Sequence, residues 1–310
     1  KNNKNKYKYS VSFDNNIENL ETTIIETNYE NKLKRNIKNI INKVDITQYI
    51  SEKIFLKYQL TLNSYFLNSN TRNLIDNNIS LNYNFNAANN FTFGYNNNNK
   101  ITELIKQLDN NFIVNYQTIN IPNNINNDTF INKKTFSFAY NNYKSKNEQF
   151  FTLNLTYSFY NLNTTTNNTY FNNYSMFSNQ IGKDYKNLIG VLIYERKIKI
   201  LPLIIKSSFS IDYTANVNYI NSLVNNTIFS KSILDINLTS SIKKLKTHFQ
   251  LSYIAENVNL NQSLIKDKYN LLTQNIGFKI ISKINSFKIE PSANYLIQNG
   301  SLNSNHQTLL

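Results

Sequence analysis

Several residue types that commonly mark active or metal sites are scarce in this chain. It contains no cysteine, which excludes disulfides, thiolate metal ligands and a thiol nucleophile. Its five glycines form neither of the glycine-rich patterns that hold phosphates. Its two histidines, His248 and His306, have no second histidine or cysteine at ligand spacing. We therefore predict no metal, cofactor or catalytic site, and a function other than that of an enzyme.

Long apolar runs are absent as well. No stretch approaches the roughly 18 to 20 uninterrupted apolar residues of a transmembrane helix, which excludes spanning by helices. Residues 1–9 are polar and basic and lack the apolar core of a signal peptide, so we expect that such a peptide was removed or that the sequence is part of a longer chain. No change in composition marks a boundary, and residues 1–310 are predicted to form one domain.

The net charge of +14 could indicate a nucleic acid, an anionic membrane surface or an anionic ligand as partner. The abundance of Asn, Lys, Ile, Tyr and Phe is instead typical of a strongly AT-rich coding sequence. No arginine-rich segment or basic cluster is present. We therefore predict no nucleic-acid partner and interpret the charge as a consequence of composition.

Alternation of apolar and polar residues is the strongest pattern in the sequence. Over residues 205–219 almost every odd position is apolar, and every even position is polar. Similar tracts occur at residues 7–13, 56–62, 79–85, 136–140, 151–159, 234–242, 249–253, 276–280 and 287–297. A period of two residues is typical of β-strands with one apolar face.

The length of these tracts favours a membrane protein over a soluble sandwich. Several run 10 to 15 residues, whereas globular strands have about five or six and a tilted transmembrane strand about 9 to 11. An apolar content of 40% fits, because only alternate residues of a barrel strand face lipid. We therefore predict an all-β fold, an antiparallel transmembrane β-barrel.

Individual side chains follow from this assignment. The polar alternate positions Lys206, Asp212, Asp235, Lys288 and Glu290 are predicted to face the lumen, as is His248. Candidates for the interfacial aromatic girdles are Tyr157, Phe159, Tyr160 and Tyr219. The carboxylates Asp184, Glu195 and Glu256 could serve an enzyme at the barrel rim, but we interpret them as scattered rim charges. Pro291 removes a ladder donor and predicts a bulge or an early strand end.

The connections fall into two length classes, as a barrel with short periplasmic turns and long outer loops requires. Short turns are expected near residues 51–53, 86–90, 143–147, 195–202, 243–245 and 283–286, and long loops near residues 67–77, 161–184, 221–230, 256–269 and 298–305. Alternation of the two classes requires residues 96–133 to form one large outer loop without a full crossing. About fourteen spanning strands result, with a possible fifteenth beginning near His306.

One segment also resembles a known family. It comprises Phe91-Thr92-Phe93-Gly94-Tyr95-Asn96-Asn97, Ile101-Thr102-Glu103-Leu104-Ile105-Lys106-Gln107-Leu108, Phe112-Ile113-Val114-Asn115-Tyr116-Gln117 and Ile121-Pro122-Asn123. It resembles an outer-loop region of TonB-dependent receptor-like barrels, with Gln107-Leu108 and Tyr116 at matching places. Gln117 stands where the family has arginine, and the loop proline of the family is missing near Ile101.

The resemblance implies a receptor of about twenty-two strands in the outer membrane of a Gram-negative bacterium, within the range known for such barrels. It also implies a ligand bound at the outer loops, and an energy-coupling inner-membrane complex that acts through a plug absent from this chain. The last five residues lack the terminal aromatic of such barrels, so we expect a fragment. A passive porin, a fatty-acid-type channel and a surface adhesin or structural barrel remain alternatives. The ligand and its binding residues are not predicted.

Overall fold

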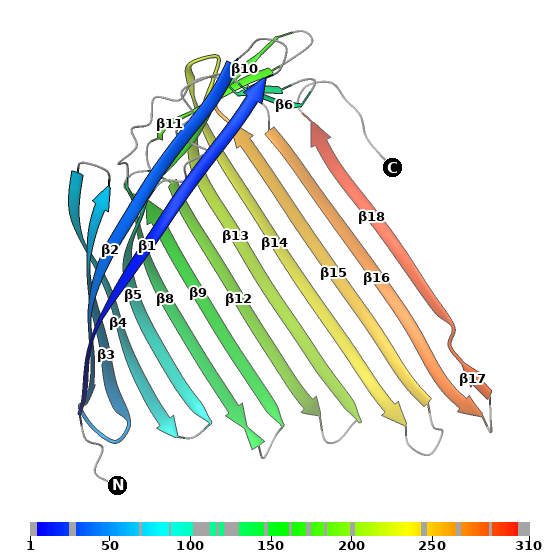
Figure 1. Cartoon of the computed structure of the whole chain (residues 1–310). Coiled ribbons are helices and arrows are strands. Elements are labelled where there is room, and N and C mark those ends of the chain that lie inside the picture. Colours follow the sequence, from blue (N-terminus) through cyan, green and yellow to red (C-terminus); the bar gives the residue numbers. More distant parts are fainter. Residues whose placement is uncertain are drawn as a thin grey trace.

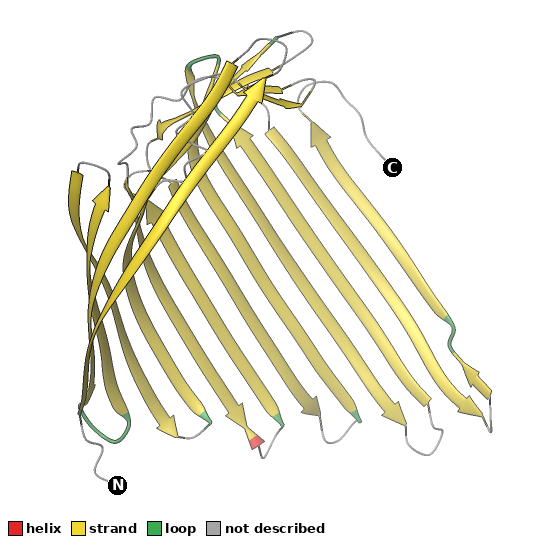
Figure 2. Cartoon of the chain, in the orientation of Figure 1, coloured by secondary structure: helices red, strands yellow, loops and turns green. Residues whose placement is uncertain are grey.

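The described part of the chain is one all-β structure (Figure 2). The computed structural model describes all residues except 1–4, 25–28, 68–69, 87, 102–111, 116–117, 121–129, 146–147, 161–162, 172–174, 183–184, 199–201, 243–246, 265–267, 285–286 and 303–310. Eighteen strands belong to one sheet. No helix long and apolar enough to cross a membrane occurs among the described residues.

The strands differ widely in length. The long ones are β1 (Lys6–Ile24), β2 (Tyr29–Tyr49), β3 (Ile54–Leu67), β4 (Asn70–Asn86), β5 (Asn89–Ile101), β8 (Phe130–Lys144), β9 (Gln149–Tyr160), β12 (Tyr185–Ile198), β13 (Leu203–Ile220), β14 (Leu223–Ile242), β15 (Thr247–Gln262), β16 (Lys268–Ile284) and β18 (Ser292–Leu302). The short ones are β6 (Phe112–Asn115), β7 (Thr118–Asn120), β10 (Asn163–Tyr170), β11 (Ser175–Gly182) and β17 (Phe287–Ile289).

The long strands pair antiparallel, each with its neighbours, in the order β1, β2, β3, β4, β5, β8, β9, β12, β13, β14, β15, β16 and β18. Short β17 pairs with the end of β16 and continues the line of β18. In Figure 1 the two outermost strands, β1 and β18, point toward the same end of the sheet. They do not pair with each other, so the described sheet is not closed.

The break between β17 and β18 agrees with the prediction for Pro291. Proline has no backbone N–H, so it cannot donate to the ladder. In the structure Glu290 and Pro291 lie outside both strands, while the Pro291 carbonyl still accepts a hydrogen bond from the Ile280 N–H, 3.0 Å away. One strand is therefore interrupted without losing its place beside β16.

Most of the short turns lie where they were predicted. Short connections join β2 to β3, β4 to β5, β8 to β9, β12 to β13 and β16 to β17. The predicted turn at residues 243–245 lies outside the described residues. All of these connections lie at one end of the long strands, opposite to the hairpins β6–β7 and β10–β11 (Figure 1).

Four of the predicted long loops were wrong. Residues 70–77 belong to β4, 223–230 to β14, 256–262 to β15 and 298–302 to β18. The chain reverses between β13 and β14 at Asn221 and Ser222, whose φ angles of 50° and 64° are those of a two-residue type I′ hairpin turn. Asparagine is common in turns, but its backbone groups complete a ladder like those of any other residue. An Asn-rich strand was therefore mistaken for a loop.

The predicted loop at residues 96–133 was too wide. Its first and last residues belong to β5 and β8, which pair directly from Asn97 with Lys134 to Ile101 with Phe130. Between them the described residues contain only the short hairpin β6–β7, which does not enter the sheet between β5 and β8. The predicted loop at residues 161–184 likewise contains a hairpin, β10–β11, which pairs in parallel with the end of β13.

Candidate functional site: two opposite faces of one sheet

Pairing partners in an antiparallel sheet point to the same face, so the register assigns side chains to faces. One row of partners consists of Tyr7, Ile46, Tyr58, Ile79, Tyr95, Phe136, Tyr157, Leu188 and Tyr213. We call the face that carries this row the apolar face, and the opposite one the polar face. The apolar residues of all ten predicted tracts lie on the apolar face. The alternation in separate segments therefore combines into one continuous surface.

The polar alternate positions lie together as well. Lys206, Asp212, Asp235 and Lys288 belong to the polar face. Glu290 lies outside the strands, and its carboxylate forms ion pairs with Lys288 and, at 3.4 Å, with Lys279 of the same face. One row of this face runs through Lys8, Asp45, Gln59, Asn78, Asn96, Thr135, Ser158, Asn187 and Thr214 without an apolar residue. In this row the sheet is two-sided over nine neighbouring strands, whereas on β12 the polar face also carries the exposed apolar residues Ile189 and Ile193.

The distribution of burial is the reverse of that in a soluble protein. Large apolar side chains are exposed, among them Tyr7 (71%), Tyr295 (64%) and Ile75 (54%). The buried residues of the described part are mostly polar, including Asn225 (0%) and Ser158 (5%), while buried hydrophobic residues are limited there to Ile37 and Leu67. Soluble monomers rarely expose an apolar surface of this extent.

The apolar surface has the slant that tilted strands require. The row that contains Tyr7 on β1 reaches Asn270 on β16 through successive partners. The centre of the tract at residues 7–13 is displaced from this row by three residues, away from the short turns. The centre of the tract at residues 276–280 is displaced by eight residues in the opposite direction, toward the short turns. A drift of about eleven residues, or 37 Å, across eleven strand spacings, or 53 Å, gives a tilt of about 35°. Transmembrane barrel strands tilt by about 35–45°.

The height of the surface is also informative. On β9 the apolar face is occupied from Phe151 to Phe159, about 27 Å along the strand. With a tilt of about 35° this becomes about 22 Å, close to the apolar band of about 25 Å on outer-membrane barrels. Lys134 and Lys186 lie on the apolar face in the row of Phe159, where the ammonium of Lys134 lies 5.7 Å from the Phe159 ring centroid. Lysine therefore borders the band on these strands.

Three of the four residues predicted for the aromatic girdles lie on the apolar face. Tyr157, Phe159 and Tyr219 lie on the apolar face, and the rings of the first two are 6.1 Å apart. Tyr160 lies on the polar face, where its ring makes a T-shaped contact with Tyr185 at 5.1 Å. Consecutive strand residues point to opposite faces, so Phe159 and Tyr160 cannot belong to one girdle.

The carboxylates considered for a catalytic role are engaged in ion pairs on separate strands. Glu195 lies 3.2 Å from Lys206, and Glu256 lies 2.6 Å from Lys231. His248 is exposed on the polar face of β15. Asp184 and His306 lie outside the described residues, and the described part holds no group of three or more side chains suited to a metal ion.

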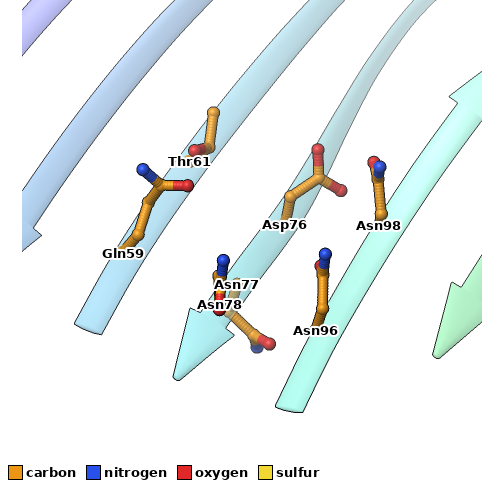
Figure 3. Close-up of a pocket in the computed structure, with 7 residues that line it drawn as sticks. All are labelled: Gln59, Thr61, Asp76, Asn77, Asn78, Asn96 and Asn98. Carbon is orange, nitrogen blue, oxygen red and sulfur yellow. The ribbon is translucent and has the colours of Figure 1, made fainter. Parts of the chain in front are cut away.

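A hollow of about 160 Å³ lies on β3, β4 and β5 (Figure 3). It is lined by Gln59, Thr61, Asp76, Asn77, Asn78, Asn96 and Asn98. The predicted loop at residues 67–77 had assigned Asp76 and Asn77 to a connection, so the sequence alone gave no reason to place them beside Gln59 and Asn96. A strand assignment for residues 70–78 would have aligned the polar positions of three neighbouring strands.

Comparison with known proteins provides no relative for this arrangement. No protein-family model matches the chain, and no curated protein or solved structure does. The contrast between the two faces of the sheet is therefore the main basis for assigning a function.

Proposed function

We propose that this chain is the membrane-embedded part of a β-barrel in the outer membrane of a Gram-negative bacterium, and that it serves as a receptor or transport channel. The apolar face contacts lipid and the polar face lines a water-filled interior. The observation that carries the proposal is the exposure of one continuous apolar face opposite a face whose buried residues are mostly polar.

Physical chemistry supports this location. A two-sided sheet in water would bury its apolar face against a second layer, because apolar surface is expelled from water. Here the described apolar face has no covering layer, and its large side chains remain exposed. In a bilayer the same face meets hydrocarbon, while the ladders between long neighbouring strands satisfy the backbone groups. The tilt of about 35° and the band height of about 22 Å fit the same environment.

The receptor role rests on the resemblance of residues 91–123 to an outer-loop region of TonB-dependent receptor-like barrels. In this proposal β5 leads from the membrane into a ligand-binding outer region at the end of the sheet that carries β6–β7 and β10–β11. A barrel of about twenty-two strands, a plug and an energy-coupling inner-membrane complex belong to the same proposal. The partner on the apolar face is outer-membrane lipid.

Single tryptophan variants test which face meets lipid, because the chain has no tryptophan of its own. Leu155 on the apolar face and Asn154 on the polar face are neighbours on β9, and both are exposed. We expect brominated lipids to quench the fluorescence of Leu155→Trp strongly and that of Asn154→Trp weakly, since bromine quenches only at contact. Equal quenching at the two positions would contradict the lipid-facing assignment.

A further inference from the structure

The hollow on β3, β4 and β5 consists of two adjacent rows of the polar face. Gln59, Asn78 and Asn96 are successive partners in one row. Thr61 and Asp76 are partners in the next row, and Asn98 adjoins them on β5. Figure 3 shows the lining residues on the three neighbouring strands, with Gln59 and Thr61 on β3, Asp76 and Asn78 on β4, and Asn96 and Asn98 on β5. Regular pairing of rigid strands therefore fixes the distances between these polar groups.

Elsewhere on the polar face, similar side chains hydrogen-bond one another. The Asn187 amide donates to Asp212 at 3.1 Å and to Thr214 at 3.0 Å. The hydroxyl of Thr152 donates to Asn141 at 2.8 Å. Such pairs satisfy polar groups internally and leave few of them for a ligand.

The hollow is different in this respect. Within the described part of the chain, the side chains of Asn78, Asn96 and Asn98 make no hydrogen bond, and all three are exposed. Each amide offers two N–H donors and one carbonyl acceptor. The hollow therefore brings together three side-chain amides whose donors and acceptors are not used within the described part of the chain.

The charges around the hollow disfavour an anionic ligand. Its lining contains one carboxylate and no lysine or arginine. That carboxylate, Asp76, accepts hydrogen bonds from the Asn63 amide at 2.7 Å and from the backbone N–H of Asn99 at 2.8 Å. The nearby Asp45 accepts from Gln59 at 2.7 Å and lies 3.7 Å from the Lys43 ammonium. An anion would meet this carboxylate without a compensating cation, despite the positive net charge of the whole chain.

We propose that this hollow binds a neutral, hydroxyl-rich molecule of about the size of one sugar ring. Hydroxyl groups donate and accept, as the unused amides and the Thr61 hydroxyl do, and a neutral ligand avoids the desolvation cost of an ion. The volume of about 160 Å³ is below that of sites for drug-sized ligands, about 300–1,000 Å³. The inference rests on the proposed function, in which the polar face lines a water-filled interior accessible to such a solute.

Nuclear magnetic resonance of the full chain in detergent micelles tests this site. Maltose, one ring of which would occupy the hollow, is the neutral probe, and a sugar phosphate and glucosamine are the charged probes. We expect maltose to shift the side-chain amide signals of Asn78, Asn96 and Asn98. The double variant Asn96→Ala with Asn98→Ala should bind maltose about tenfold more weakly, as expected for the loss of a pair of neutral hydrogen bonds. Asn294→Ala serves as the control, because Asn294 is an exposed amide on the polar face of β18.

Unchanged maltose affinity in the double variant, the absence of any shift, or tighter binding of the sugar phosphate or of glucosamine would overturn the inference. An equal loss of affinity in the Asn294→Ala control would do the same. The outcome is distinct from that of the tryptophan experiment. Weak quenching of Leu155→Trp together with maltose binding that depends on Asn96 and Asn98 would remove the membrane proposal and leave the binding site.

Discussion

A charge placed on the apolar face near the middle of the band should weaken folding in lipid strongly. Ile211 is suited to this experiment, because it lies next to the centre of the tract at residues 205–219 on β13, about 3 Å from the midpoint of the tract. Its row partners are Gly190 on β12 and Ser232 on β14, and neither supplies a counter-charge. An arginine at this position must therefore deform the bilayer or extend to its surface.

For Ile211→Arg we expect the free energy of unfolding to fall by about 2–4 kcal/mol, the cost of arginine at the midplane of a lipid-facing strand. Asp212→Arg is the matched control on the next residue, which points to the polar face. There the cost should stay below about 1 kcal/mol, because the side chain remains hydrated. Asn187, which donates to Asp212 at 3.1 Å, retains its second acceptor on Thr214.

The measurement is a denaturant titration of each variant in lipid vesicles, followed by the change in β-structure. Variants must be compared in the same lipid, since the cost depends on depth in the bilayer. Equal destabilisation by the two substitutions would refute the assignment of faces. A larger effect at Asp212 would indicate that the polar face contacts lipid.

Two further predictions concern the ends of the strands. Ser222, with a φ of 64°, lies in a region where glycine is favoured. Ser222→Gly should therefore raise the free energy of unfolding by up to about 1 kcal/mol in the same titration, because the left-handed strain of about 1–2 kcal/mol exceeds the entropic cost of glycine, about 0.5–1 kcal/mol. A loss of stability would mean that the hydrogen bond from the Asn167 amide to the Ser222 hydroxyl, at 3.4 Å, contributes more than this strain. Ser222→Cys, but not Ser145→Cys in the turn between β8 and β9, should react with an impermeant thiol reagent on intact cells, because the two exposed residues lie at opposite ends of the strands. Reaction of Ser145→Cys alone would reverse the orientation.

Alternation in the sequence was sufficient to predict which side chains share a face. Because strand side chains have a period of two, Phe209 and Lys206 are assigned to opposite faces without any knowledge of their partners. The structure places Phe209 beside Leu192 and Leu234, both from apolar tracts or their continuation. The pairing between strands that are distant in the sequence therefore agrees with the alternation within each strand.

The extent of the strands could not be predicted in the same way. On β4 the residues 70–78 carry little apolar alternation, and on β2 polar and charged residues interrupt it, so neither segment was among the predicted alternating tracts. Both are held by pairing with the longer apolar tract of β3. The context of a neighbouring strand overrides the weak β propensity of asparagine and lysine. The hollow beside Asp76 was missed for the same reason.

The parallel orientation of β1 and β18 limits the ways in which the sheet can be completed. A closed barrel in which all neighbouring strands are antiparallel needs an even number of strands. A sheet whose two edge strands point in the same direction contains an odd number of strands. Direct joining of these edges would create a parallel ladder, and so would head-to-tail joining of identical copies. Only an odd number of additional strands between the two edges restores strict antiparallel order. In hydrocarbon, each backbone group of an edge strand that is left without any hydrogen-bond partner costs several kcal/mol.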